Sequence, residues 1–178
     1  MRKFFTLAYP KLSEKDATFV EDFRRRHDGH HELARAHFTL VFGRSNVDER
    51  AYLEHVREVA RLSRPTPFVC RYAMLGADDE AERAHVFLVP DEGYSGISRL
   101  HDALYRQEMA AFLRLDIPYV PHITLGSSAD RAAMKTCCDE LNEATLSIHG
   151  SVEALTVAAL ESGSLVDVAS FPLRSRGA

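Results

Sequence analysis

Several features that would define a function by themselves are scarce or missing in this chain. The three cysteines, Cys70, Cys137 and Cys138, are an odd number and lack the spacing of a metal site. No apolar run approaches the length that crosses a membrane, and no segment is of low complexity. The sequence also contains no serine-hydrolase elbow, no phosphate-binding glycine loop and no dinucleotide fingerprint. We therefore expect a cytoplasmic protein in a reducing compartment, with no membrane partner.

Positive charge is scarce as well. Asp and Glu number 26 against 22 for Lys and Arg, which gives a formal net charge of −4. Binding of a long nucleic acid duplex requires a basic surface, so we do not expect that partner. A small ligand with one phosphate requires only a local cationic site and remains compatible with this charge. With 178 residues, 46% of them hydrophobic, the chain predicts a single domain over residues 1–178, and we expect a monomer.

One short pattern occurs twice, as His37-Phe38-Thr39-Leu40 and as His122-Ile123-Thr124-Leu125. With nine His and eight Thr in the chain, random placement predicts about 0.4 such His-x-Thr matches, so two are unexpected. Each copy lies in a short apolar run that is typical of a strand, where side chains alternate between faces. The histidine and threonine of each copy then share one face, and the apolar residues between them point into a core.

The order of the predicted elements repeats around the two motifs. Helix starts are indicated by Ser13, by Asn46 with Glu49 at the capping-box position, and by Ser128. Gly43 and Gly126 each break the strand that follows a motif histidine. Hydrophobic periodicity predicts helices over 13–27, 46–62, 96–113 and 128–143, and strands over 3–9, 37–42, 68–75, 84–89, 122–126, 151–160 and 165–172.

This repetition indicates an internal duplication of one supersecondary unit. Each half reads helix, His-x-Thr-Leu strand, glycine, capped helix and two strands, with the first lobe at about 30–90 and the second at about 95–173. We predict an α+β fold of two pseudo-symmetric lobes, with two antiparallel sheets around a central cleft and helices on the outside. A pseudo-twofold axis would place the two motif strands across that cleft. Generic α+β alternation without duplication is the alternative.

On these motifs and this element order, the chain resembles the 2H phosphoesterase superfamily, which includes 2′-5′ RNA ligase-like proteins and cyclic phosphodiesterases. The resemblance covers residues 3 to about 173. It implies a bilobal fold, catalytic roles for His37 and His122, and phosphate binding by Thr39 and Thr124. It also implies that neither a metal nor another cofactor is needed.

The chemistry of the motif residues agrees with that implication. Opening a 2′,3′-cyclic phosphate requires a base that activates water and an acid that protonates the leaving sugar oxygen. Histidine does either near neutral pH. The threonine hydroxyls of the two motifs are suited to donating hydrogen bonds to the non-bridging phosphate oxygens. We therefore predict a metal-independent phosphodiesterase for nucleotide or RNA-end 2′,3′-cyclic phosphates, or for a similar small cyclic phosphodiester.

Three alternatives stay open at this point. A 2′-5′ RNA ligase or 2′-5′ phosphodiesterase would use the same two histidines, because their roles exchange in the reverse reaction. A non-catalytic module that binds nucleotides or RNA ends would retain the fold, although binding alone does not require two titrating groups. A structural domain with accidental motifs is the third. The sequence does not distinguish the acid from the base.

The remaining histidines have structural interpretations. The polar cluster at 27–31 is interpreted as a solvated loop rather than a metal site, because it has no distant partner at ligand spacing. His55 and His101 lie on predicted helices and are expected at the surface or its edge. His85 lies in an apolar strand and is expected to be structural, and His149 lacks a following threonine and receives no role.

Five further residues have two interpretations each. Tyr9, Tyr94 and Tyr119 lie near the ends of elements that would meet the cleft, where a tyrosine can stack on a base or simply pack. Packing is the favoured interpretation. Arg35 and Arg44 flank the first motif, where they could hold phosphate, although exposure at the surface is favoured for both.

Overall fold

A computed structural model describes residues 2–77 and 82–174, which form four α-helices, one 3-10 helix and nine strands. The helices are α1 (Glu14–His27), α2 (Glu49–Leu62), α3 (Tyr94–Leu104), η1 (Gln107–Phe112) and α4 (Arg131–Glu143). The strands are β1 (Lys3–Ala8), β2 (Pro10–Leu12), β3 (Phe38–Arg44), β4 (Thr66–Ala77), β5 (Ala84–Glu92), β6 (Ile123–Ser128), β7 (Ile148–Val152), β8 (Ala154–Glu161) and β9 (Ser164–Pro172).

Local capping explains where the helices begin. Ser13 accepts a hydrogen bond from the Asp16 backbone N–H at 3.1 Å, so the predicted cap of α1 is confirmed. The predicted caps of α2 and α4 are wrong by two residues, because Asp48 and Asp130 cap these helices instead. Both carboxylates accept the backbone N–H three residues later at 2.9 Å, and a carboxylate is also favoured by the helix dipole.

The helix predicted over 96–113 is interrupted. The α-helical part ends at Leu104, Gln107 has a positive φ of 55°, and the chain continues as the short helix η1. Arg106, between the two helices, has an extended backbone with φ −99° and ψ 166°, which ends the helical path before η1 begins. The short strands β2 and β7, which the sequence pattern did not predict, pair with each other in the structure.

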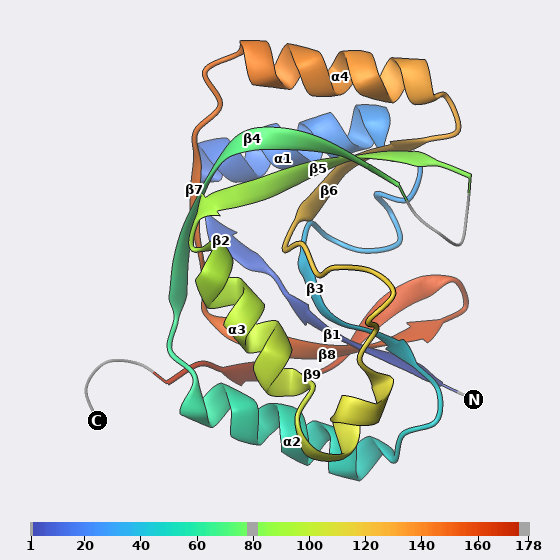
Figure 1. The fold of residues 1–178 in the computed structure, drawn as a ribbon, viewed down its shortest axis with the longest axis vertical. Coiled ribbons are helices and arrows are strands. Elements are labelled where there is room, and N and C mark those ends of the chain that lie inside the picture. The colour runs from blue at the N-terminus through green and yellow to red at the C-terminus, as the bar shows by residue number, and fades with distance from the viewer. Residues whose placement is uncertain (1, 78–81, 175–178) are drawn as a thin grey trace.

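The strands form a single antiparallel sheet in the order β2-β7-β4-β5-β6-β3-β1-β8-β9, which is strongly curled (Figure 1). The mixed α and β composition is confirmed, but the predicted division into two separate sheets is not. A single residue pair, Phe38 with Ile123, connects β3 to β6 and makes the two groups of strands continuous. The expectation of two sheets came from the repeated order of elements, which does not show whether the two groups of strands are joined.

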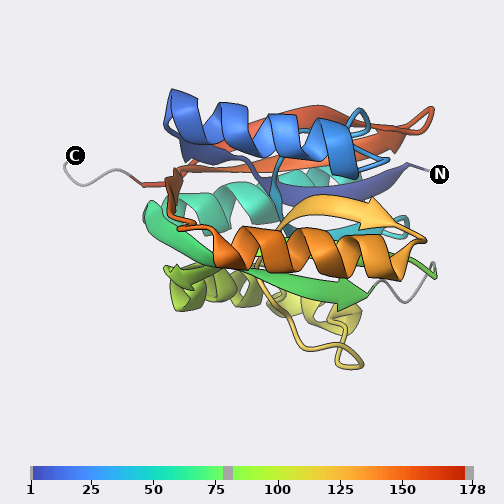
Figure 2. The ribbon, with the colours of Figure 1, turned by 90° about the horizontal axis from the view of Figure 1, so that it is seen from above.

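Most helices pack on one of the two groups of strands, and α3 contacts both. Both α1 and α4 contact β6, and α4 also contacts β4 and β5, whereas α2 contacts β8 and β9 (Figures 1 and 2). The helix α3 contacts α2 and β3 on one side and β4 and β5 on the other. No helix in residues 2–77 and 82–174 combines the length and apolar character needed to cross a membrane.

Strand pairing brings together segments from the two halves of the sequence. The strand β4, which follows the first motif, pairs with β5 beside β6, the strand of the second motif. The strand β8, which follows the second motif, pairs with β1 beside β3, the strand of the first motif. A helix crosses over too, since α1 precedes β3 in the chain but packs on β6, and α3, which precedes β6, reaches β3 as well as β4 and β5. Each motif strand is therefore supported by elements from the other half of the sequence.

Apolar residues of the motifs form part of the core. Phe38, Leu40, Ile123 and Leu125 are completely buried. Phe38 contacts Phe68 of β4 edge-to-face, with ring centroids 5.2 Å apart. The motif strands are thereby fixed from their inner side, and the alternating residues on the opposite side are left for other contacts.

Candidate active site

The four polar motif residues lie on one face at the junction of β3 and β6. Phe38 is paired with Ile123 in antiparallel register, so His37 lies across from Thr124 and Thr39 across from His122. All four polar side chains are partly exposed, while the apolar residues between them are buried. The strand pairing therefore places two imidazoles and two hydroxyls around one point of the sheet, each histidine beside the threonine of the other motif.

The two histidines make matching hydrogen bonds with their own backbone. His37 donates from Nδ1 to the carbonyl oxygen of Arg35 at 2.6 Å. His122 donates from Nδ1 to the carbonyl oxygen of Val120 at 2.7 Å. A carbonyl oxygen only accepts, so Nδ1 carries the hydrogen in both rings, and in each neutral ring Nε2 holds the lone pair. Both rings therefore have the same tautomer and direct Nε2 away from the backbone.

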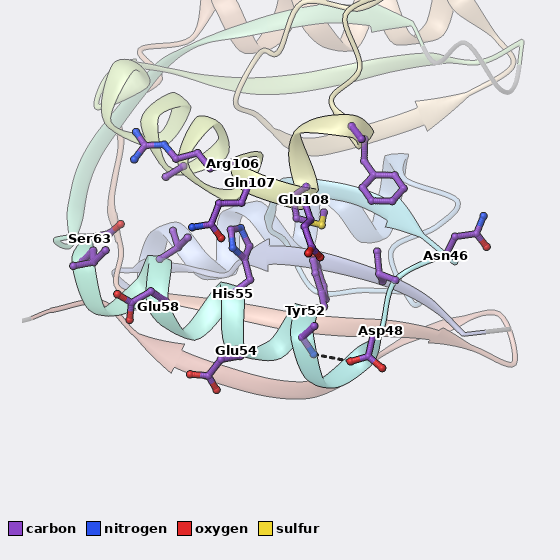
Figure 3. Close-up of a pocket in the computed structure, with 18 residues that line it drawn as sticks. Asn46, Asp48, Tyr52, Glu54, His55, Glu58, Ser63, Arg106, Gln107 and Glu108 are labelled. Atoms are coloured by element: carbon purple, nitrogen blue, oxygen red, sulfur yellow. Dashed lines mark hydrogen bonds between the residues drawn. The ribbon is translucent and has the colours of Figure 1, made fainter.

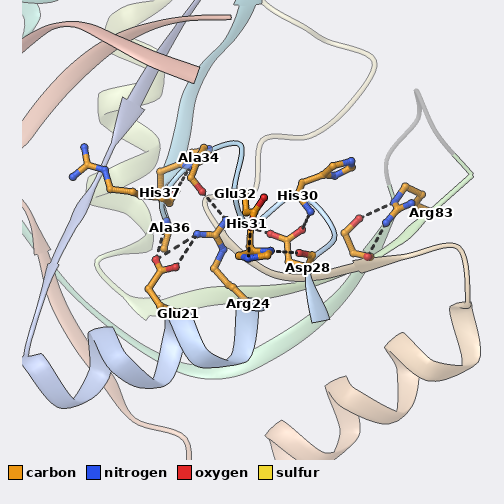
Figure 4. A network of polar contacts seen from close by, with 12 residues as sticks. Glu21, Arg24, Asp28, His30, His31, Glu32, Ala34, Ala36, His37 and Arg83 are labelled. Carbon is orange, nitrogen blue, oxygen red and sulfur yellow. Dashed lines mark hydrogen bonds and ion pairs between the residues drawn. The ribbon is translucent and has the colours of Figure 1, made fainter. Parts of the chain in front are cut away.

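A charged network on α1 anchors the segment that leads to His37 (Figure 4). Arg24 and Asp28 are 3% and 5% exposed and form an ion pair at 3.2 Å. Arg24 also donates to the carbonyl oxygen of Ala34 at 2.8 Å. Glu21 accepts the backbone N–H of Ala36 at 3.2 Å. These contacts fix the chain at two of the three residues that precede His37.

An aromatic pair anchors the segment that leads to His122. The Tyr119 ring stacks on His101 of α3, with centroids 3.7 Å apart and ring planes 4° apart. Tyr119 donates its hydroxyl to the carbonyl oxygen of Thr39 at 3.1 Å, and His101 donates from Nδ1 to the carbonyl oxygen of Leu40 at 2.8 Å. Both bonds end on β3, so this pair connects the approach to His122 directly to the first motif.

Each histidine also has an aromatic neighbour. Tyr9 meets the His37 ring edge-on at 6.3 Å and donates its hydroxyl to Asp167 at 2.7 Å. The Arg35 guanidinium lies 3.9 Å from the Tyr9 ring centroid and pairs with Asp167 at 2.9 Å. Burial, followed by the hydrogen bond to Asp167, raises the pKa of Tyr9 to about 12. Phe87 of β5 instead stacks on the face of His122 at 3.8 Å.

Electrostatics favour the neutral form of both motif histidines. Burial is the largest cause that lowers the pKa of His37, and the hydrogen bond to Arg35 opposes it. Burial likewise lowers the pKa of His122 to about 4, helped by repulsion from His37 and His85 and opposed by the bond to Val120. Neutral imidazoles with an available Nε2 are competent proton acceptors.

Other predicted candidates have different surroundings. Among residues 27–31, Asp28 is committed to Arg24 and accepts the His30 backbone N–H at 3.0 Å, while His31 donates to the Asp28 carbonyl oxygen at 3.1 Å. Within the described part of the chain, no group of three or more His, Cys, Asp or Glu is placed to hold a metal ion. His149 is exposed and bonds to Ser147.

Three expectations for single residues can be compared with their contacts. The expectation that His101 lies at the surface or edge is wrong, because its side chain is 4% exposed and carries the Leu40 bond. Tyr94 donates to the Tyr119 carbonyl oxygen at 3.3 Å. The Arg44 side chain donates to the Phe112 carbonyl oxygen, so that guanidinium is partly occupied inside the protein.

Sequence reasoning missed Phe87, Arg24 and the pairing of His101 with Tyr119. The signal for Arg24 was available, because an arginine on the inner face of a helix four residues before an aspartate predicts an ion pair. For Phe87 and His101 the sequence holds no comparable signal, since their partners lie in other elements.

A cavity of about 1170 Å³ lies away from the motif histidines, between α2 and η1 (Figure 3). Neither motif contributes to its lining, which includes Tyr52, His55 and Arg106. Two of its acidic side chains, Glu54 and Glu58, pair with arginines three residues later on α2. Its size alone therefore does not identify it as the reaction site.

The sequence and the fold were compared with known proteins. A family model described as the 2′-5′ RNA ligase superfamily matches residues 12–163. No curated protein sequence matches the chain. Among solved structures, Escherichia coli LigT in its apo form is similar with a TM-score of 0.59 and 19% identity, covering 97% of each chain.

A second solved structure has the same fold. Usb1 from Kluyveromyces marxianus is similar with a TM-score of 0.55 and 12% identity, covering 96% of this chain and 98% of that one. Both likenesses extend over nearly the whole of the compared chains, so the curled sheet with its outer helices is an arrangement that they share.

Proposed function

Because the chain belongs to the 2′-5′ RNA ligase superfamily, within the 2H phosphoesterases, we propose that it is a phosphodiesterase that opens small cyclic phosphodiesters. The proposed substrates are 2′,3′-cyclic phosphates of nucleotides or of RNA ends. The observation that carries this proposal is the matched pair of Nδ1 hydrogen bonds of His37 and His122, which leave Nε2 of each ring available at the junction of the motif strands.

In the proposed reaction the two histidines act on opposite sides of phosphorus. His122 accepts a proton from water at Nε2 while the water oxygen bonds to phosphorus. The bond between phosphorus and one ribose oxygen breaks, and the protonated His37 donates its Nε2 proton to that oxygen. Atoms and charge balance because one histidine gains the proton that the other supplies. A proton exchange with solvent then restores both rings.

The surroundings of the rings support this assignment of roles. Phe87 covers one face of His122, and an imidazole removed from water favours the neutral form that a base requires. Tyr9 meets His37 only edge-on. The negative charge of a bound cyclic phosphate favours the protonated form of a neighbouring imidazole, so substrate binding itself supplies the acid.

The motif threonines have a separate role in this proposal. Thr39 and Thr124 donate hydroxyl hydrogen bonds to the non-bridging phosphate oxygens, where negative charge increases during attack. Each lies across from the histidine of the other motif, which suits a phosphate held between the strands. Replacing either with alanine is expected to cost less activity than replacing a histidine.

Nucleotides bound to structurally similar proteins support the proposed substrate class. Escherichia coli LigT has been solved with 3′-AMP and with phosphate, and Kluyveromyces marxianus Usb1 with uridine monophosphate. The net charge of −4 also favours a short substrate over a long duplex.

A second candidate function is 2′-5′ RNA ligation or cleavage of 2′-5′ linkages. The family description favours it, and the reverse of the proposed reaction would use the same two proton-transfer groups. A non-catalytic module that binds RNA ends is the third candidate, but it gives no reason for two histidines with the same tautomer at one site.

The test is product analysis with the four nucleoside 2′,3′-cyclic phosphates in the presence of a chelator. We expect ring opening by the wild-type protein and by His149→Ala, which changes an exposed histidine outside the site. The His37→Ala/His122→Ala double variant should be inactive. Full turnover by the double variant would refute the two-histidine mechanism. No turnover by the wild type would favour oligonucleotide 2′-5′ linkages, which the same assay can then include.

A further inference from the structure

Phe87 is the one aromatic ring that is stacked on a motif histidine in the described part of the chain. Its centroid lies 3.8 Å from that of His122, with the ring planes 25° apart. We propose that Phe87 is a positioning residue that fixes the plane of the His122 imidazole and excludes water from one of its faces. The hydrogen bond to Val120 holds one atom of the ring, and a ring held at one atom can still pivot. The stack removes that freedom.

The strand register directs Phe87 toward His122. Val86 pairs with Gly126, but the next pair is Phe87 with Thr124, so β6 has one additional residue at Leu125. Such a bulge bends the strand and changes where the neighbouring side chains point. Phe87 thereby lies beside the second motif as a whole, paired with its threonine and stacked on its histidine.

A glycine on the adjacent strand provides the space for the Phe87 ring. A Cβ atom at Gly76 of β4 would lie 2.0 Å from Cε2 of Phe87, far closer than any real contact. His85, two residues before Phe87 on β5, stacks on the same ring at 5.6 Å with planes 21° apart. The position of Phe87 is therefore determined from β4, β5 and β6 together.

This arrangement affects the protonation of His122. The titratable groups that act on it are His37 and His85, and both oppose a positive charge on the ring. Attraction between an imidazolium and an aromatic face works in the other direction. Burial is nevertheless the largest cause of the low pKa of His122, which is about 4. Removing the ring that covers His122 should therefore raise this pKa toward the ordinary value near 6.5.

The first test compares the wild type with Phe87→Leu by NMR titration of the ¹⁵N-labelled imidazoles, with His122→Gln identifying the His122 signal. We expect the titration midpoint of His122 to lie at higher pH in Phe87→Leu than in the wild type. In Phe87→Tyr, which keeps an aromatic face, the midpoint should be close to the wild-type value. The kinetic part of this test rests on the proposed function. In Phe87→Leu, kcat should fall roughly 10- to 100-fold with little change in KM, because the His122 imidazole is misplaced rather than removed.

A second variant reaches the same ring without changing Phe87 itself. Gly76→Ala should displace the Phe87 ring and move the His122 midpoint in the same direction. Tyr9→Leu is the matched control, because Tyr9 contacts His37 and not His122, so the His122 midpoint should move much less than in Phe87→Leu. The melting temperature of each variant separates a local change from loss of the fold.

The inference and the proposed function can fail separately. A His122 midpoint that stays at its wild-type pH in folded Phe87→Leu and folded Gly76→Ala would overturn the positioning role, whatever the protein hydrolyses. A midpoint that moves in a protein that opens none of the cyclic phosphates would support the positioning role and refute the function.

Discussion

The segment before His37 and the segment before His122 reach the same backbone geometry through different side chains. In both, a histidine donates from Nδ1 to the carbonyl oxygen two residues earlier. The first segment is held by the buried ion pair of Arg24 and Asp28, and the second by the neutral stack of Tyr119 on His101. The two segments thus share the direction of their imidazoles, while the surroundings that produce it differ.

This difference has energetic consequences. A buried ion pair contributes little net stability, but loss of one partner leaves a charge in an apolar environment. A stacked aromatic pair loses its contacts more gradually when one group changes. We therefore expect the two halves to respond unequally to comparable substitutions, although both motifs are needed for turnover.

The largest expected effect concerns the histidines themselves. His37→Ala and His122→Ala should each reduce kcat roughly 10²- to 10⁴-fold, because each removes a proton-transfer group. The pH profiles should differ, with loss of the base removing the acid-side limb in His122→Ala and loss of the acid removing the alkaline-side limb in His37→Ala. Steady-state assays with a nucleoside 2′,3′-cyclic phosphate measure both. Identical profiles for the two variants would contradict the assigned roles.

The charged anchor should show the next largest effect. Arg24→Met leaves the Asp28 carboxylate buried without its partner, which typically costs about 3–5 kcal/mol of unfolding free energy. Urea unfolding measures this change, and Arg24→Met/Asp28→Asn should recover part of it. If the single variant remained within 1 kcal/mol of the wild type, the buried pair would not be the anchor we describe.

Acid pH should weaken the folded protein through buried histidines such as His101 and His122. Burial is the largest cause that lowers the pKa of each in the folded protein, so below about pH 6.5 the unfolded chain binds more protons. Stability is then fully present above the ordinary histidine pKa and falls as the pH drops toward 4, by at most about 1.4 kcal/mol per pH unit for each histidine. His122→Gln should flatten this dependence, whereas His149→Gln should not. Urea unfolding at several pH values measures this dependence, and equal slopes of unfolding free energy against pH in the two variants would refute the prediction.

The smallest effect is expected at the aromatic anchor. Tyr119→Phe keeps the stack on His101 and removes only the hydrogen bond to the Thr39 carbonyl oxygen, which is worth about 0.5–1.5 kcal/mol. The same urea experiment should therefore show a smaller change than for Arg24→Met. A larger change in Tyr119→Phe would reverse the comparison between the two halves.

The sequence predicts those parts of this structure that depend on local patterns. Alternation of buried and polar residues in the two motifs determines that His37 and Thr39 share a face, because strand geometry requires it. The Ser13 cap of α1 is equally local. The motif residues of the candidate site could therefore be named from the sequence, together with the family.

Features that depend on partners distant in the chain could not be predicted. Periodicity predicts β4 and β8 as strands, but it does not predict their partners. It does not show that β4 pairs with β5, the neighbour of β6, or that β8 pairs with β1, the neighbour of β3. The helices α2 and α4 are capped by Asp48 and Asp130 rather than by the predicted Asn46 and Ser128. Several polar residues near each helix start are suitable N-caps, so the preference for polar caps does not select one of them. The contact of Phe87 with His122 likewise depends on a bulge that leaves no mark in the hydrophobic pattern.

The exchange of strands between the two halves determines when each becomes complete during synthesis. The β4–β5–β6 group contains residues 66–128 and can assemble once that stretch has left the ribosome. The β3–β1 pair uses residues 3–44, yet its outer neighbour β8 begins only at Ala154. One edge of β1 therefore stays unpaired until β8 has been made, so the strand of His37 gains its completed sheet only after the strand of His122 has been made.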